Sequence, residues 1–233
     1  RGGVLLDKDF LKPQAFHDSP VTRSGGVAAI ISLSFFFIIY YLLYTIILYD
    51  YIFVSYSVFL VGFLDDLRIN IKPLTRLLIM VFALFIIIYF LPIRILNIDI
   101  PFLTSLMSNH IFSSIFVLLC FLFVINGANL IDGFNGLLTI NLIIINIVLT
   151  YININNLNFE FSILIISQII ILLSFLLFNF PTAKIFLGDS GAYTMGALTS
   201  LNTIITNNLN PEISSFFFCT LLFYLFFEVF FSF

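Results

Sequence analysis

Residues 61–78 read VGFLDDLRINIKPLTRLL. An apolar run ends at two adjacent aspartates, Asp65 and Asp66, and three basic residues follow at Arg68, Lys72 and Arg76. The dipole of a helix disfavours anions at its C-terminal end. We therefore expect a bound cation or an exchangeable proton to compensate this pair of carboxyl groups.

The whole chain is far more apolar than a soluble domain. Of its 233 residues, 61% are hydrophobic and 9% are charged, whereas a soluble domain usually carries about 25% charged residues. This composition predicts an integral membrane protein. Cys120 and Cys219 both lie in apolar runs, which favours small buried hydrophobes over a disulfide framework or a zinc site.

Apolar segments long enough to cross a membrane recur along the sequence. A membrane helix needs roughly 20 apolar residues, or fewer where neighbouring helices shield it. We predict an all-α fold, a polytopic transmembrane helix bundle that forms a single integral membrane domain over residues 1–233. The eight expected spans are 24–46, 50–64, 75–93, 109–126, 136–152, 161–179, 191–206 and 213–233.

The two ends of the chain predict a piece of a longer protein. The opening RGGVLLDKDF lacks an initiating Met and does not look like a cleavable signal peptide. The last residues, FFEVFFSF, are still apolar. We therefore expect a fragment that is truncated at both ends.

Eight crossings would place alternate connections on opposite sides of the membrane. One set of connections is 1–23, 65–74, 127–135 and 180–190, and the other is 47–49, 94–108, 153–160 and 207–212. Lys and Arg lie almost wholly in or beside the first set, while the second set holds only Arg94. The positive-inside rule makes the first set cytoplasmic. Most tyrosines lie near the opposite ends of the spans, as expected for an interfacial belt.

Each connection of the first set carries a polar cluster. The clusters are DKDFLKPQAFHDSPVTRSGG (7–26), the Asp65-Asp66 pair, NGANLIDGFNGLL (126–138) and FPTAKIFLGDSGAY (180–193). Taken singly, they are also explained by interfacial charges, turn residues or a helix cap. Taken together, they bring four aspartates from three connections to one predicted face.

This combination favours a cation site that binds phosphates. Carboxylates with neighbouring Asn side chains offer oxygen ligands, which favour Mg²⁺, or alternatively Mn²⁺, over zinc. Mg²⁺ held by one or two carboxylates usually completes its shell with substrate phosphates, and Lys or Arg neutralises the remaining charge. The sequence therefore predicts a site for a nucleotide diphosphate at the cytoplasmic surface, where a soluble donor meets a lipid acceptor.

Four motifs in order give a resemblance to a known family. They are PVTRSGG (20–26), GFLDDL (62–67) with the basic segment behind it, NLIDGFNGL (129–137) and FLGDSG (186–191). The chain resembles the polyprenyl-phosphate N-acetylhexosamine-1-phosphate transferases, which include the phospho-N-acetylmuramoyl-pentapeptide transferase. The resemblance covers essentially the whole chain. It implies a multi-pass enzyme of the bacterial inner membrane that transfers a sugar-1-phosphate from a UDP-sugar to undecaprenyl phosphate, releases UMP and requires Mg²⁺.

The resemblance also implies a role for each motif residue. The four aspartates would be catalytic: Asp189 would bind the metal, and Asp132 would bind the metal or contact the nucleotide diphosphate. Asp65 would position or deprotonate the lipid phosphate, and Asp66 would support the metal–phosphate network. The remaining substrate-binding residues would be Lys12, His17, Arg23, Asn129 and Asn135.

Two departures from the family pattern bear on these roles. Many members have an aspartate where this chain has Asn135, and the Asn form resembles the branch that initiates O-antigen or other surface polysaccharides. The family also continues into a basic loop with a His-x-His motif, whereas this chain ends at Phe233. Activity is therefore expected of the longer parent protein rather than of these residues alone.

Other functions remain as alternatives. Within the family, the alternative is the pentapeptide transferase of peptidoglycan synthesis. From another class, the alternative is a carboxylate-dependent transporter, which would place ionisable residues near mid-span, where this chain has almost none. We expect a donor and an acceptor substrate but no nucleic acid as partners, and a homodimer is left open.

Overall fold

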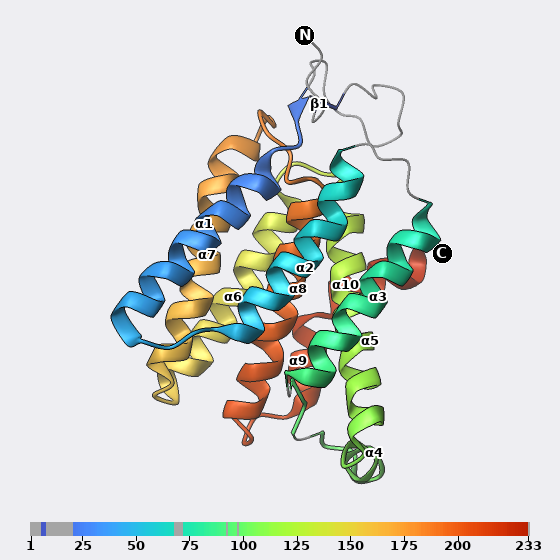
Figure 1. Ribbon diagram of the computed structural model, residues 1–233. Helices are drawn as coiled ribbons and strands as arrows, with labels where there is room; N and C mark the ends of the chain where they lie inside the picture. Colours follow the sequence, from blue (N-terminus) through green and yellow to red (C-terminus); the bar gives the residue numbers. More distant parts are fainter. Residues whose placement is uncertain (1–5, 8–20, 68–71, 92, 97, 233) are drawn as a thin grey trace.

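The computed structural model describes residues 6–7, 21–67, 72–91, 93–96 and 98–232. Long helices run side by side along most of its length (Figure 1). They are α1 (Gly25–Tyr44), α2 (Tyr49–Asp66), α3 (Pro73–Phe90), α5 (His110–Ile131), α6 (Leu137–Asn155), α7 (Phe159–Asn179) and α8 (Gly188–Leu209). The shorter helices are α4 (Pro101–Met107), α9 (Ser215–Leu221) and α10 (Phe223–Phe231).

The only strands among the described residues are two short ones near the N-terminus. β1 (Leu6–Asp7) and β2 (Val21–Thr22) form an antiparallel pair. The prediction of an all-α polytopic bundle is therefore confirmed.

The outer surface of the bundle suits lipid. Large apolar side chains project from the outer helices, such as Leu177 of α7, 79% exposed, and Phe82 of α3, 69% exposed. Water would be a poor solvent for such a surface, whereas hydrocarbon tails are as apolar as the side chains themselves. The chain is accordingly an integral membrane protein.

Seven of the eight predicted spans each overlap one helix, and the eighth overlaps two. Among the described residues, five helices are long and apolar enough to cross a membrane, namely α1, α3, α5, α6 and α7. Helix α2 carries Asp50, Asp65 and Asp66, and α8 is rich in polar residues. The predicted span 213–233 is broken at Leu222 into α9 and α10. The number of crossings stays a prediction.

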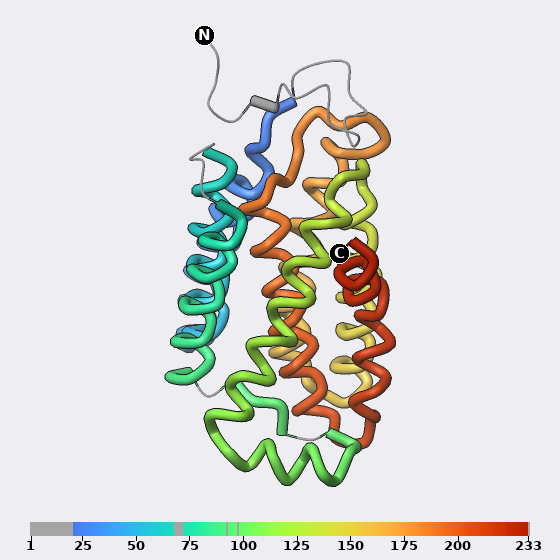
Figure 2. The backbone as a smooth tube through the Cα atoms, turned by 90° about the vertical axis from the view of Figure 1, so that its right-hand side faces the viewer, coloured from blue at the N-terminus to red at the C-terminus, as the bar shows by residue number. Residues whose placement is uncertain are grey.

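Helix α8 forms the centre of the bundle. It packs against α1, α2, α5, α6 and α7, and most of its residues are buried. Figure 2 shows the bundle from the side, with the helices lying around the α8 segment. A helix surrounded in this way does not need an apolar surface, so its Ser, Thr and Asn residues are tolerated where their hydrogen bonds are satisfied.

A network of uncharged polar side chains satisfies them. Asn202 of α8 donates to the Oδ1 atom of Asn146 at 2.9 Å and to the Oε1 atom of Gln168 at 2.7 Å. Its own Oδ1 atom accepts the hydroxyl of Tyr51 at 2.6 Å. Further along, Asn153 donates to the hydroxyl oxygen of Thr206 at 2.9 Å. These bonds join α2, α6, α7 and α8 inside the apolar bundle.

The helices extend into three connections that the sequence predicted as loops. Helix α2 runs to Asp66, α5 runs to Ile131, and α8 begins at Gly188. The predicted loops 65–74, 127–135 and 180–190 are thus partly helical. The predicted boundaries followed the end of each apolar run, whereas the hydrogen bonds of a helix continue through polar residues at its end.

Candidate active site

The C-terminal end of α2 meets the N-terminal end of α8 through Asp66. Its carboxylate accepts the backbone N–H groups of Asp189 and Ser190, both at 3.0 Å, and the Ser190 hydroxyl at 2.6 Å. The Asp66 side chain is fully buried. The positive end of the α8 dipole therefore stabilises a charge that the dipole of α2 disfavours.

Glycine permits this close approach. Gly188 has φ +74°, which favours residues without a Cβ. A Cβ at this position would lie 2.8 Å from both carboxylate oxygens of Asp66. On the facing helix, a Cβ at Gly62 would lie 2.6 Å from the Cα of Ser190. The two helices can therefore bring Asp66 and Asp189 together only because both positions are glycine.

The segment before α1 runs along the segment before α8. The N–H of Phe186 donates to the carbonyl of Thr22 at 2.8 Å, and the N–H of Gly25 donates to the carbonyl of Phe186 at 3.0 Å. This pairing brings Arg23 to Asp66, with 4.0 Å between Nη1 and Oδ1. The structure thus places the predicted Arg23 beside the aspartates.

Arg76 of α3 joins the other two members of the group. Its Nη1 atom donates to Asp65 Oδ2 at 2.7 Å and to Asp189 Oδ2 at 2.9 Å. The three side chains keep 22%, 29% and 19% of their surface exposed, respectively. Arg76 also lies over the ring of Tyr193, with 5.5 Å from its guanidinium carbon to the ring centroid.

The end of α5 contributes Asn129 and Asp132. Asn129 donates to the hydroxyl oxygen of Tyr193 at 3.4 Å, so it contacts the residue over whose ring Arg76 lies. Asp132 follows the last residue of α5. Burial, and then the carboxylates of Asp189 and Asp66, raise its pKa well above the usual range.

Asp189 has a perturbed pKa for similar reasons. It lies in the first turn of α8, before the expected span that begins at residue 191. Burial first, and then the neighbouring carboxylates Asp65 and Asp66, raise its pKa to about 7, while Arg76 opposes the shift. Carboxyl groups that resist ionisation in this way are typical of sites that bind a cation or a proton.

Asn135 lies apart from this group. Its side chain donates to the carbonyl of Pro181 at 3.2 Å. Nearby, the N–H of Gly136 donates to the Asn179 side chain at 2.6 Å, and Asn179 donates to the carbonyl of Ile185 at 3.0 Å. Asn135 therefore helps to join the loop before α6 to the loop before α8. The predicted Lys12 and His17 lie outside the described residues.

The donor set of the group suits a hard cation. No three His, Cys, Asp or Glu side chains of the described segments form a metal-binding group. Asp65 and Asp189, however, direct one oxygen each at a single positively charged nitrogen, the Nη1 atom of Arg76. Two carboxylate oxygens that converge on one cation fit Mg²⁺, which commonly uses one or two protein carboxylates.

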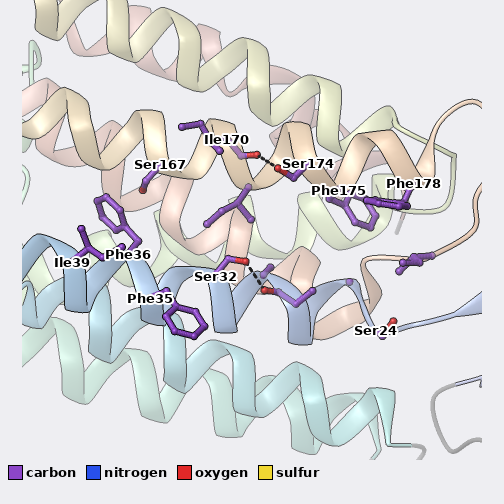
Figure 3. A pocket seen from close by; sticks show the side chains of 15 residues that line it. Ser24, Ser32, Phe35, Phe36, Ile39, Ser167, Ile170, Ser174, Phe175 and Phe178 are labelled. Atoms are coloured by element: carbon purple, nitrogen blue, oxygen red, sulfur yellow. Dashed lines mark hydrogen bonds between the residues drawn. The ribbon is translucent and has the colours of Figure 1, made fainter.

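A separate groove lies between α1 and α7 (Figure 3). Its volume is about 480 Å³. The hydroxyls of Ser32 and Ser174 in its lining donate to carbonyls of their own helices, at 2.9 Å to Ala28 and 2.8 Å to Ile170. The rest of the lining is mainly apolar, and none of the four aspartates belongs to it. The groove is therefore not the candidate active site.

Comparison with known proteins decides the family. A model of glycosyl transferase family 4 matches residues 47–207, well over half of the chain. The chain belongs to glycosyl transferase family 4. The matched range includes Asp65, Asp66, Asp132 and Asp189 together with Arg76.

Three relatives share the name phospho-N-acetylmuramoyl-pentapeptide-transferase. The phospho-N-acetylmuramoyl-pentapeptide-transferase of Orientia tsutsugamushi (strain Ikeda) is 29% identical over 238 residues, which cover 82% of this chain and 62% of the relative. The protein of the same name from Clostridium perfringens (strain 13 / Type A) is 31% identical over 153 residues, 62% of this chain and 48% of the relative. The one from Leuconostoc mesenteroides is 42% identical over 80 residues, 34% of this chain and 25% of the relative. The chain thus spans about half the length, or less, of several family relatives that it matches.

Three members of the group, Arg76, Ser190 and Tyr193, were not among the predicted site residues, and Arg76 was named only as one of the bases that follow the aspartate pair. Ser190 lies within the quoted FLGDSG motif, and its hydroxyl bonds to Asp66. Tyr193 lies one helical turn after Asp189, so the i, i+4 spacing was an available signal. Its ring is buried, which made it indistinguishable from a core aromatic residue before the structure placed Arg76 over it.

Proposed function

We propose that the protein transfers a sugar-1-phosphate from a UDP-sugar to a polyprenyl phosphate at the membrane surface and releases UMP. The observation that carries the proposal is the Asp65–Arg76–Asp189 group at one end of an apolar bundle. A partly exposed set of charges at that end is accessible both to a soluble donor and to the headgroup of a lipid. Membership of glycosyl transferase family 4 supports the same reaction.

Each residue has a task that follows from its contacts. Asp65 is partly exposed, and its Oδ2 atom faces the cation position; its other oxygen, Oδ1, would orient or deprotonate the acceptor phosphate. Asp66 is fully buried and positions Asp189 by holding the start of α8. Arg23 and Arg76 neutralise phosphate charge, which is the main requirement in phosphoryl transfer.

Asp65 and Asp189 would hold the Mg²⁺ that the family resemblance implies. When bound, the ion neutralises the diphosphate and stabilises the charge on the leaving nucleotide. Asp132 lies close enough for its charge to act on Asp189 and Asp66, and its part as a second metal ligand stays a prediction. We place this end of the bundle on the cytoplasmic side of the bacterial inner membrane, because the basic residues gather there.

Two donor sugars are candidates. Asn135, in place of the aspartate of many members, supports an N-acetylhexosamine donor and the initiation of O-antigen or another surface polysaccharide. The names of the relatives support UDP-N-acetylmuramoyl-pentapeptide and peptidoglycan synthesis instead. We favour the first, because Asn135 is this chain's own departure from the aspartate of many members, whereas the names describe the relatives.

The test is UMP release by the complete protein in detergent with undecaprenyl phosphate and Mg²⁺. UDP-N-acetylglucosamine and UDP-N-acetylmuramoyl-pentapeptide are supplied in parallel. We expect release with the first donor, dependent on both the lipid and the cation, and loss of release in Asp65→Asn and Asp189→Asn. Release with the pentapeptide donor alone would favour the peptidoglycan role. Full activity of both variants would overturn the site.

A further inference from the structure

Arg76 occupies the point at which two helices direct their carboxylates. Asp65 lies at the end of α2 and Asp189 at the start of α8, and both bond to the same nitrogen of Arg76 at 2.7 and 2.9 Å. The third helix, α3, contributes only the arginine. The guanidinium therefore does for these two carboxylates what a metal ion would do: it offsets their repulsion and fixes their separation.

A guanidinium and a metal ion cannot occupy this point together. Mg²⁺ binds oxygen at about 2.0–2.1 Å and demands near-octahedral geometry, so it would need both oxygens that Arg76 now uses. Arg76 has room to leave, because 22% of its side chain is exposed. In its present position the guanidinium carbon lies 5.5 Å from the centroid of the Tyr193 ring.

We propose that Arg76 is a resident counter-ion of an Asp65–Asp189 cation site and gives up this position when a divalent cation binds. The guanidinium then turns towards the mouth of the site, where it binds a phosphate of the substrate. The exchange itself does not depend on the proposed function; only the phosphate contact rests on it. In the cation-free protein, Arg76 keeps two like charges together and so preserves the site for the ion.

The first experiment measures cation affinity without any substrate. The free Mn²⁺ concentration is followed by electron paramagnetic resonance in the complete protein, in wild type and in Arg76→Gln. We expect Arg76→Gln to bind Mn²⁺ about tenfold more tightly, because the ion no longer has to break charge-assisted hydrogen bonds. Asp189→Asn should abolish the tight binding, which locates it at this site.

The matched control is Lys72→Gln. Lys72 is exposed and lies four residues before Arg76, directly before α3, so its removal subtracts the same charge nearby. Its Mn²⁺ affinity should stay within about twofold of wild type, since exposed charges at this distance interact weakly. Equal affinity of Arg76→Gln and Lys72→Gln, or no binding by any of the proteins, would overturn the proposal.

The second readout is turnover, which should fall in Arg76→Gln while the Mn²⁺ affinity rises. Arg76→Gln should lower kcat about 100-fold or more despite its tighter Mn²⁺ binding, because arginines that act on transferred phosphoryl groups contribute at least that much. Arg76→Lys should keep the Mn²⁺ affinity near that of wild type and recover part of kcat. If Arg76 only stabilised the fold, Arg76→Gln would lower both the Mn²⁺ affinity and kcat. That result would contradict the exchange.

A third measurement needs no variant and therefore does not depend on variant folding. The wild-type protein is treated with phenylglyoxal, and the modified arginines are located by mass spectrometry. Saturating Mn²⁺ should increase modification of Arg76, because its guanidinium leaves two carboxylates. Arg94 lies in the connection that follows α3, and its modification should not change. Unchanged or reduced modification of Arg76 would show that the arginine stays in place.

Discussion

A hydrogen bond between Asp66 and Ser190 joins the C-terminal end of α2, where the helix dipole disfavours an anion, to the N-terminal end of α8, where the dipole favours one. The carboxylate of Asp66, the last residue of α2, accepts both the backbone N–H and the hydroxyl of Ser190, in the first turn of α8. The adjacent N–H of Asp189 donates to the same carboxylate. The position of Asp189 in the candidate active site therefore depends on a residue that is itself buried and out of reach of a substrate.

The two neighbouring aspartates should differ in what they do for stability. Asp66→Asn replaces an acceptor oxygen with an NH₂ group that faces other donors, so the fold should lose about 2–3 kcal/mol. Asp65→Asn should cost less than about 1 kcal/mol, since its ion pair with Arg76 is partly exposed. Thermal unfolding in detergent measures both changes.

Turnover, measured beside stability, shows whether each variant loses activity because a reacting group is missing or because the fold is weakened. Asp65→Asn should abolish UMP release with its unfolding temperature almost unchanged. Asp66→Asn should lower both. If Asp65→Asn proved the less stable of the two, the division between a positioning and a reacting carboxylate would be wrong.

Gly62 should be intolerant of even one methyl group. A Cβ there would lie 2.6 Å from the backbone N and Cα of Ser190 and from the carbonyl oxygen of Asp189, all of them backbone atoms of α8. Gly62→Ala should therefore separate α2 from α8, destabilise the protein by about 1–3 kcal/mol and reduce turnover. Ser55→Ala is a control in the same helix.

The control is matched for burial. Ser55 is fully buried, and its hydroxyl donates to the carbonyl of Ile52 in its own helix at 3.1 Å. Its loss should change the unfolding free energy by less than about 1 kcal/mol. Unfolding temperatures and UMP release of the two variants, measured side by side, provide the comparison. Equal behaviour would mean that α2 and α8 adjust freely at Gly62.

Apolar runs predicted where the helices lie but not what each helix faces. The ranges 24–46 and 161–179 match α1 and α7 closely, because both helices present apolar side chains to lipid. The range 191–206 was also correct as a helix, yet nothing in its hydropathy distinguishes a central helix from a peripheral one. The buried partners of Asn202 became apparent only once α2, α6 and α7 were in place around it.

The candidate site was predictable to a similar degree. Alternating helices bring every second connection to one end of a bundle, so four aspartates on one face followed from topology. The contacts within that face did not follow. Asp65 and Asp66 are adjacent in sequence, but one bonds to Arg76 and the other to the α8 amides. That division depends on the rotation of α2 about its axis, which a short polar motif does not fix.

The polar network inside the bundle should contribute strongly to stability. Asn202→Leu removes two hydrogen bonds that its amide donates and one that it accepts, and it leaves Tyr51, Asn146 and Gln168 without those partners. We expect a loss of about 2–4 kcal/mol. Tyr51→Phe removes one of the three bonds and should cost about 1 kcal/mol. Thermal unfolding in detergent measures both, and a smaller loss in Asn202→Leu than in Tyr51→Phe would contradict the network.

The sidedness of the bundle can be tested by chemical labelling. Single cysteines are introduced at Lys72, directly before α3, and at Leu157, in the turn between α6 and α7, in a background with Cys120 and Cys219 replaced by Ala. Both side chains are exposed, Leu157 to 74%. A membrane-impermeant maleimide added to intact cells should label Leu157→Cys but not Lys72→Cys, since the basic end of the bundle is expected to face the cytoplasm. Permeabilised cells should label both. Labelling of Lys72→Cys in intact cells would place the aspartates outside the cytoplasm, away from any cytoplasmic nucleotide sugar.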